Sequence, residues 1–106
     1  MTEDTIAEVG IDQEQRLFVR PTSEAFPQIY RAAMGIDWDQ EEEYLFAPAP
    51  KDWTYVNWFN QIIWAAADEY GVWLRLTPDT VWSGVSDELC AEIQSGPIPP
   101  IATRLS

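Results

Sequence analysis

The sequence predicts a single α+β domain in which about three helices pack on one face of a small, mostly antiparallel sheet. Two features lead to this class. Short stretches rich in β-branched and aromatic residues alternate with segments of helical periodicity, and no linker divides the chain into halves. The 106 residues also match the usual size of a domain with one core. We therefore expect the order strand, helix, strand, helix, strand, strand, helix.

The two ends of the chain are expected to lie outside the globular domain, which we place at residues 16–96. Residues 1–15 carry five acids and few large apolar side chains, so they are expected to form an acidic solvated arm, with at most an edge strand around 6–11. Residues 97–106 are rich in proline, which favours an extended C-terminal tail over a helix or a central strand.

The first strand and the first helix are expected between residues 16 and 35. Residues 16–20 have the β-branched and aromatic character of a strand, which Pro21 ends. The following stretch, 23–35, shows the i, i+3, i+4, i+7 spacing of a buried helical stripe. The residues of this stripe are Phe26, Ile29, Tyr30 and Ala33. Pro27 requires the helix to begin close by, and Gly35 is a suitable end.

The strongest pattern predicts a helix over residues 54–70. It follows a short strand at 44–47, begins at a cap supplied by Asp52 or Thr54, and ends at Gly71. At about 100° per residue, one broad arc of this helix is apolar. The residues on that arc are Tyr55, Trp58, Phe59, Ile62, Ile63, Ala66 and Tyr70.

The last third of the domain is expected to contain two strands and a short helix. In 72–77 the residues Val72, Leu74 and Leu76 alternate with Trp73, Arg75 and Thr77. The first three should enter the core, and the other three should lie on the more solvated face of the strand. A turn at 77–79 then leads to a possible return strand at 80–82. Ser86 caps the helix 87–95, whose Leu89, Cys90 and Ile93 are expected to point inward.

The charge limits the classes of partner. Eighteen acidic and six basic residues give a formal net charge of −12, which repels phosphate backbones and anionic lipid head groups. We therefore expect neither nucleic acid nor a membrane as a partner. The same field attracts basic proteins and cationic small molecules, although solubility alone also accounts for such a charge.

The inventory of reactive side chains favours a protein that is not an enzyme. Histidine is absent, which removes the commonest general base, and the single Cys90 forms neither an internal disulfide nor a zinc site by itself. The acidic run at 37–43 begins like a calcium loop but has Glu42 and Pro48 where that loop needs glycine and glutamate. No cofactor and no metal are therefore expected. A reducing cytoplasm fits the lone cysteine and the absence of a secretory signal or an apolar membrane span.

The tryptophan of the long helix stands apart from the apolar arc. Trp64 lies in the middle of a polar arc, where its indole is expected to face water unless something covers it. The other residues of that arc are Asn57, Asn60, Gln61 and Asp68. An aromatic anchor inside a rim of amides is typical of an interface centre, so we favour contact with a second copy or another protein. Covering by the arm or the tail, and simple exposure, remain alternatives.

Glu69 presents the reverse case, because its helical angle lies inside the apolar arc. Either it bends outward to solvent, or it is enclosed and needs Arg75 or Arg31 as a partner. In the enclosed case, Glu69 would form with Tyr55, Trp73 and Trp82 an aromatic pocket that suits a cationic ligand.

The segments "RLFVRPTSEAFPQIYRAAMGIDWD" and "YLFAPAPKDWTYVNWF...AAADEYGVWLRLTPDTVW" resemble small uncharacterised proteins encoded in bacterial integron gene cassettes. The resemblance covers roughly residues 16–93. It implies a compact α+β fold, cytoplasmic residence and a tendency to self-associate, and it carries no catalytic motif.

These observations together predict a small acidic binding protein that acts without catalysis and forms a homo-oligomer through the Trp64 face. A neutraliser of a basic protein, of the immunity or antitoxin type, and a pocket for a cationic small molecule are the alternatives.

Overall fold

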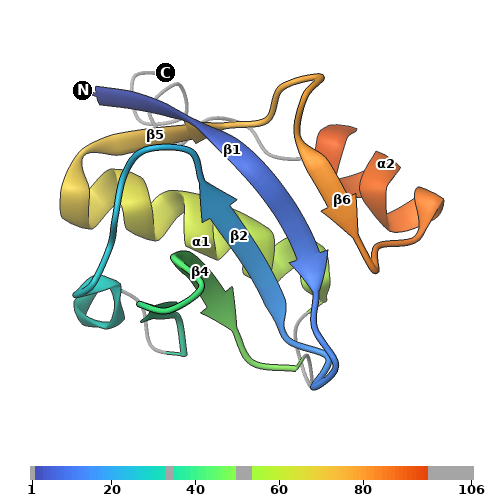
Figure 1. Ribbon diagram of the computed structural model, residues 1–106, viewed down its shortest axis with the longest axis horizontal. Coiled ribbons are helices and arrows are strands. Elements are labelled where there is room, and N and C mark those ends of the chain that lie inside the picture. Colours follow the sequence, from blue (N-terminus) through green and yellow to red (C-terminus); the bar gives the residue numbers. More distant parts are fainter. Residues whose placement is uncertain (1, 33–34, 50–53, 96–106) are drawn as a thin grey trace.

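The computed structural model describes residues 2–32, 35–49 and 54–95. In this part of the chain a six-stranded sheet lies in front of a long helix (Figure 1). The elements in chain order are β1 (Thr2–Ile11), β2 (Leu17–Pro21), the 3-10 turn η1 (Ile29–Arg31), β3 (Asp37–Asp39), β4 (Tyr44–Ala47), α1 (Tyr55–Tyr70), β5 (Val72–Arg75), β6 (Val81–Ser83) and α2 (Asp87–Ser95). The predicted α+β class is confirmed, but these described ranges contain two α-helices where about three were expected.

The sheet is mixed, with the strand order β3-β4-β2-β1-β5 and with β6 also paired to β1. The pairings β1 with β2, β2 with β4, and β3 with β4 are antiparallel. The two later strands both run parallel to β1: β5 beside residues 2–5 and β6 beside residues 8–10. The loop after β5 therefore advances the chain along β1 and does not reverse it, so the strand near 80–82 is not an antiparallel return.

The prediction of a solvated arm at residues 1–15 is wrong for residues 2–11, because these residues form β1, which pairs with three other strands. Ile6 and Val9 are both fully buried, although an odd spacing separates them. A register shift between Ile6 and Glu8 makes this possible, because a bulge turns the strand by one residue. Of the acids that suggested an arm, Asp4 is buried, Glu3 and Glu8 lie on the other face of the strand, and Asp12 and Glu14 follow its end.

The predicted helix at 23–35 is also wrong, since only the short turn η1 is helical within the described part of this segment. Several backbone N–H groups of the segment 23–35 donate hydrogen bonds to side chains of other elements. Ser23 N–H and Glu24 N–H donate to Asp4, and Gln28 N–H donates to the hydroxyl of Tyr70. Pro27 adds a position with no donor. Of the predicted stripe, Phe26 and Ile29 are fully buried, whereas Tyr30 is 57% exposed and Ala33 lies outside the described residues.

Helix α1 is the main packing element, and the prediction of a helix at 54–70 is confirmed. The Thr54 hydroxyl accepts the Asn57 N–H at 3.1 Å, and Gly71 ends the helix with φ of 65°, which is a left-handed conformation that glycine adopts without strain. Six residues of α1 are buried. They are Phe59, Ile62, Ile63, Ala65, Ala66 and Ala67. Small side chains at 65–67 let the last turns of α1 pack closely against the sheet and η1.

The alternation predicted for residues 72–77 is confirmed in β5. Val72 and Leu74 are 3% exposed each and face α1, whereas Arg75 is exposed on the opposite face. The predicted helix 87–95 is confirmed as α2. Its Ile93 is fully buried in the core, and Leu89 and Cys90 are half-buried. No helix in the described ranges is long and apolar enough to cross a bilayer.

On the face of the sheet away from α1, aromatic rings and arginines cover the strands. Phe18 and Tyr44 stack with centroids 4.5 Å apart, and the Arg20 guanidinium lies over both rings. Arg16 lies over Phe46 in the same way, 4.8 Å from the ring centroid. Arg20 is held by an ion pair with Glu8 on β1. These cation–π contacts and this ion pair close a sheet face that the two helices leave open.

Candidate functional site

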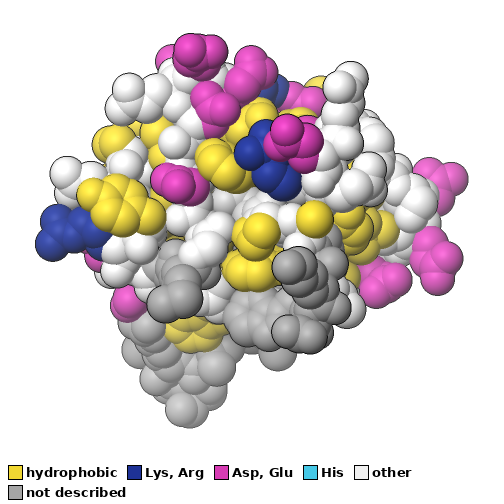
Figure 2. Space-filling view, turned by 90° about the horizontal axis from the view of Figure 1, so that it is seen from below, with side chains coloured by type: hydrophobic (Ala, Val, Ile, Leu, Met, Phe, Trp, Pro, Cys, Tyr) yellow, Lys and Arg dark blue, Asp and Glu magenta, His cyan; other side chains and the backbone are white. Residues whose placement is uncertain are grey.

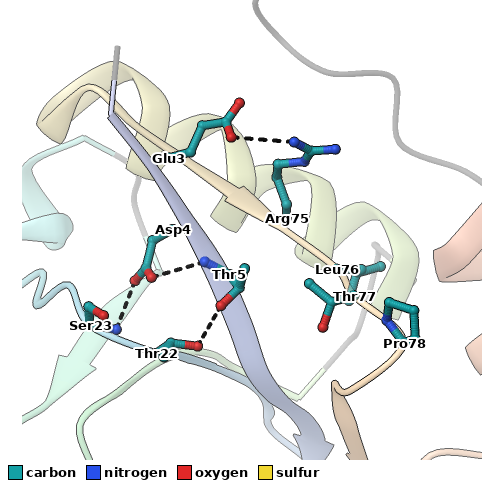
Figure 3. A pocket seen from close by; sticks show the side chains of 9 residues that line it. All are labelled: Glu3, Asp4, Thr5, Thr22, Ser23, Arg75, Leu76, Thr77 and Pro78. Carbon is teal, nitrogen blue, oxygen red and sulfur yellow. Dashed lines mark hydrogen bonds and ion pairs between the residues drawn. The ribbon is translucent and has the colours of Figure 1, made fainter.

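A hollow of about 560 Å³ lies where the start of β1 meets the end of β5 (Figure 3). We call it the β1–β5 hollow. It is lined by Glu3, Asp4, Thr5, Thr22, Ser23, Arg75, Leu76, Thr77 and Pro78. The parallel pairing of Thr5 with Arg75 places the side chains of Glu3, Thr5 and Arg75 on one face of the sheet. This is the face opposite α1, because the alternating residues Val72 and Leu74 are buried against that helix.

The buried carboxylate of Asp4 fixes one wall of the β1–β5 hollow. Asp4 is 9% exposed, and its two oxygens accept three backbone N–H groups at 2.9 to 3.0 Å, from Thr5, Ser23 and Glu24. A buried carboxylate needs such donors. Next to it, the hydroxyls of Thr5 and Thr22 lie 2.7 Å apart and are hydrogen-bonded. The segment after β2 is thereby attached to β1, and the wall has a defined shape.

A threonine pair fixes the opposite wall. The Thr80 hydroxyl donates to the Ile6 carbonyl at 2.7 Å and accepts the Thr77 N–H at 3.0 Å. These two bonds hold the turn between β5 and β6 against β1. Thr77 and Pro78 consequently stand at a fixed distance from Thr22 and Ser23 across the hollow.

The charged groups on the rim are one acid and one base. Arg75 Nη1 lies 3.3 Å from Glu3 Oε2, and the two side chains are 58% and 62% exposed (Figure 3). An ion pair this exposed contributes about 0 to 1 kcal/mol, because water screens it. Arg75 has further N–H donors and Glu3 has a second oxygen, so both groups retain capacity for other hydrogen bonds.

The side chains that line the β1–β5 hollow offer hydrogen bonds and charge, because its hydroxyls lie beside carboxylates and an arginine. Among residues 2–32, 35–49 and 54–95, no group of three or more Asp, Glu, Cys or His side chains is arranged to hold a metal ion.

The pocket predicted around Glu69 is not formed. Glu69 is exposed near the end of α1, so the alternative that it bends to solvent is the correct one. Tyr55 stands at the start of the same helix, roughly 21 Å away along an axis that rises about 1.5 Å per residue. Arg75 pairs with Glu3 and lines the β1–β5 hollow.

The two tryptophans of that predicted pocket are on opposite faces of the sheet. Trp82 is the pairing partner of Val9, whose side chain enters the core, whereas Trp73 pairs with Glu3 on the face away from α1. Both indoles are half-buried. The sequence did not show that the two indoles project from opposite faces of the sheet.

Tyr55 lines a different hollow, of about 620 Å³, between the β1–β2 turn and α2. Its hydroxyl donates to the Gln15 carbonyl at 3.0 Å. Burial and the nearby charge of Asp12 raise the pKa of the Tyr55 phenol. Burial also acts to raise the pKa of Asp12, but hydrogen bonds from the Arg16 backbone, the Arg16 guanidinium and the Glu14 N–H outweigh it and lower that pKa.

The outward face of α1 carries the predicted interface residues. Gln61, Trp64 and Asp68 line a shallow hollow of about 290 Å³ together with Ala32 and Ala65. Asn57 is exposed one turn before this hollow. Asn60 is half-buried, and neither asparagine lines the hollow. Three of the five predicted interface residues therefore line one hollow.

Of the alternatives for Trp64, simple exposure does not hold, because its indole is half-buried. Part of its cover comes from its own chain, since Ala32 of the segment after η1 lines the same hollow. The predicted cover by the N-terminal arm does not occur for residues 2–11, which lie in the sheet. The other proposed cover, the tail at 97–106, lies outside the described residues.

The fold and these hollows define a small α+β protein with several open hollows on its surface. The family model of the Integron Cassette Protein Hfx_Cass5 matches residues 4–80, and the chain belongs to this family. A solved structure of Integron Cassette Protein Hfx_Cass5, from the mobile metagenome of the North West Arm Sewage Outfall, is 41% identical. That comparison covers 90% of this chain and 95% of the other, with a TM-score of 0.47. No curated protein matches the chain. The predicted resemblance to integron cassette proteins is thus confirmed.

Proposed function

We propose that this cassette protein is a non-enzymatic binding protein of the bacterial cytoplasm, and that two copies associate through the outward face of α1. The observation that supports the proposal is the position of Trp64. Its half-buried indole stands beside a hollow with two alanines and two polar residues around it. Tryptophan is enriched at interface centres, and a recess next to an aromatic knob is a shape that a second copy complements.

A two-fold axis beside Trp64 gives this interface a specific chemistry. Two-fold contacts are the commonest in homo-oligomers, and each residue then meets a counterpart from the other copy. If the axis is perpendicular to α1 and passes between positions 64 and 65, the helices run antiparallel, and position 61 of one copy meets position 68 of the other. Gln61 of each copy then donates its amide N–H to Asp68 of the other. Each indole lies over the alanine-lined recess of its partner.

The size of α1 is compatible with such a contact. Its 16 residues extend about 24 Å, which approaches the 29 to 34 Å dimensions of the molecule. Stable interfaces bury about 1,200 to 2,000 Å² in total, so the contact also needs residues beside the helix. The segment that contains Ala32 lies on that border.

Engineered disulfides test the arrangement. In a Cys90→Ser background, Gln61→Cys and Asp68→Cys chains are purified separately, mixed, and oxidised. The antiparallel contact brings position 61 of one chain within disulfide reach of position 68 of the other, so the mixed dimer should form faster than either homodimer. A matched control replaces Gln61→Cys by Glu92→Cys on α2. Equal rates for all pairs would contradict the contact.

The second candidate is the neutralisation of a basic protein, and the net charge of −12 favours it. Figure 2 shows acidic side chains at several separate places on the visible face, with few basic ones between them. A cationic protein that co-purifies at low salt and separates at high salt is the expected result. Retention that is independent of salt would argue against charge as the basis.

A further inference from the structure

We infer that the β1–β5 hollow binds a small zwitterion, of the α-amino acid class, with the ligand carboxylate at Arg75 and the ligand ammonium group at Glu3. The inference is independent of the proposed self-association. The rim residues Glu3 and Arg75 lie on the sheet face opposite α1, so the ligand and the Trp64 contact are separate features of the molecule.

The first step is the charge of the groups that remain available to a ligand. Asp4 is negative, but its oxygens already accept three backbone N–H groups, so it belongs to the wall. Glu3 and Arg75 are then the charged groups that still offer hydrogen bonds to a ligand, and Asp4 adds one further negative charge. A lone anion meets the repulsion of Glu3, Asp4 and a chain with net charge −12, and a lone cation leaves the donors of Arg75 without an acceptor. A ligand with both charges side by side avoids both penalties.

The second step is the geometry of the rim. The Glu3–Arg75 pair is exposed and weak, so a ligand replaces it at low cost. Arginine binds a carboxylate through two parallel N–H donors, and charge-assisted hydrogen bonds are about twice as strong as neutral ones. The 3.3 Å between the two side-chain atoms shows that both charges reach one small ligand. In an α-amino acid, the ammonium and carboxylate groups are attached to the same carbon.

The third step is the lining. Thr5, Thr22, Ser23 and Thr77 supply hydroxyls that both donate and accept, so they match either ligand charge. The bonds from Asp4, from Thr22 to Thr5, and from Thr80 to Ile6 hold these residues before any ligand arrives. Such preorganisation lowers the entropy that binding costs. The volume of about 560 Å³ leaves room for a side chain beside Leu76 and Pro78.

The test uses L-serine as the probe and two analogues that each lack one charge. Ethanolamine lacks the carboxylate, and 3-hydroxypropionate lacks the ammonium group. Backbone amide spectra of the labelled full chain are recorded during titration with each compound. We expect serine to shift the amides of Thr5, Thr22, Ser23 and Thr77, and each analogue to bind at least about tenfold more weakly.

Variants separate recognition from a structural role. Arg75→Gln and Glu3→Gln should each weaken serine binding about tenfold or more, whereas the charge-matched controls Arg31→Gln and Glu41→Gln should leave it unchanged. The double variant Glu3→Arg with Arg75→Glu should restore part of the binding. The ligand can bind it in the reverse orientation, with its carboxylate at position 3 and its ammonium group at position 75. Serine that shifts none of these amides would overturn the inference. So would 3-hydroxypropionate, ethanolamine or glycerol shifting them as strongly as serine does.

Discussion

The Asp4 carboxylate accepts the backbone N–H of Ser23 at 3.0 Å, and this bond joins the central strand to the segment after β2. Asp4→Asn keeps the shape but replaces an acceptor by an NH₂ group next to other donors. We expect a loss of about 1 to 3 kcal/mol in the free energy of unfolding, which urea denaturation measures. Asp79→Asn, at an exposed position of the β5–β6 turn, should change it little. Equal losses in both variants would show that Asp4 has no such role.

Gly10 lies beneath the ring of Phe18 on the face of the sheet opposite α1. A β-carbon at Gly10 would stand 2.6 Å from Phe18 Cε2 and 2.9 Å from the Ser83 carbonyl oxygen. Gly10→Ala should therefore cost about 1 to 3 kcal/mol of stability. In a Phe18→Leu background the same change should cost less, because the smaller side chain gives way. A cost that is the same in both backgrounds would place the strain at Ser83 alone.

Asp12 is expected to make stability depend on pH in the acid range. Its folded pKa lies below the ordinary value of 3.8, because hydrogen bonds from Arg16 and Glu14 outweigh burial. The stability it contributes is therefore fully present above that value and is lost as pH falls through the folded pKa. Denaturation of wild type and Asp12→Asn should differ clearly at pH 6 and converge towards pH 2, as follows from this linkage. A constant difference would contradict the assignment.

Tyr55 is expected to make stability depend on pH in the alkaline range, where stability falls as pH rises. Burial and the charge of Asp12 raise its folded pKa above 10.0. The stability that follows is present below 10.0 and is lost as pH rises through the folded pKa. The phenolate absorbance of wild type minus that of Tyr55→Phe should therefore appear above pH 10. Asp12→Asn should move this difference titration to lower pH, and an unchanged curve would contradict the role of Asp12.

The local patterns of the sequence predicted the elements that depend on local spacing. The helix at 54–70 has a capping threonine, a terminal glycine and a continuous apolar arc, so α1 and the grouping of Gln61, Trp64 and Asp68 could be derived. The alternation of β5 is equally local. Such signals are independent of which strand pairs with which.

The features that the sequence did not predict depend on tertiary pairing. The strand β1 was not predicted, because its acids suggested a solvated arm. In addition, a bulge breaks the alternation of its buried residues. The segment 23–35 has helical spacing, but Asp4 and Tyr70 bind its donors. The Glu69 pocket required Trp73 and Trp82 on one side of the sheet, and the parallel pairings put them on opposite sides. The β1–β5 hollow was missed because three of its nine lining residues, including Glu3, belong to the presumed arm.

The association of two copies through Trp64 is tested most directly by sedimentation velocity over a range of protein concentrations. We predict that the wild-type chain sediments as an assembly and that Trp64→Glu sediments as a folded monomer, because a charged side chain cannot fill the alanine-lined recess. The matched control is Val81→Glu, which adds the same charge at a position that is 55% exposed on β6, and it should sediment like wild type. An assembly of unchanged size and affinity in Trp64→Glu would contradict the proposal.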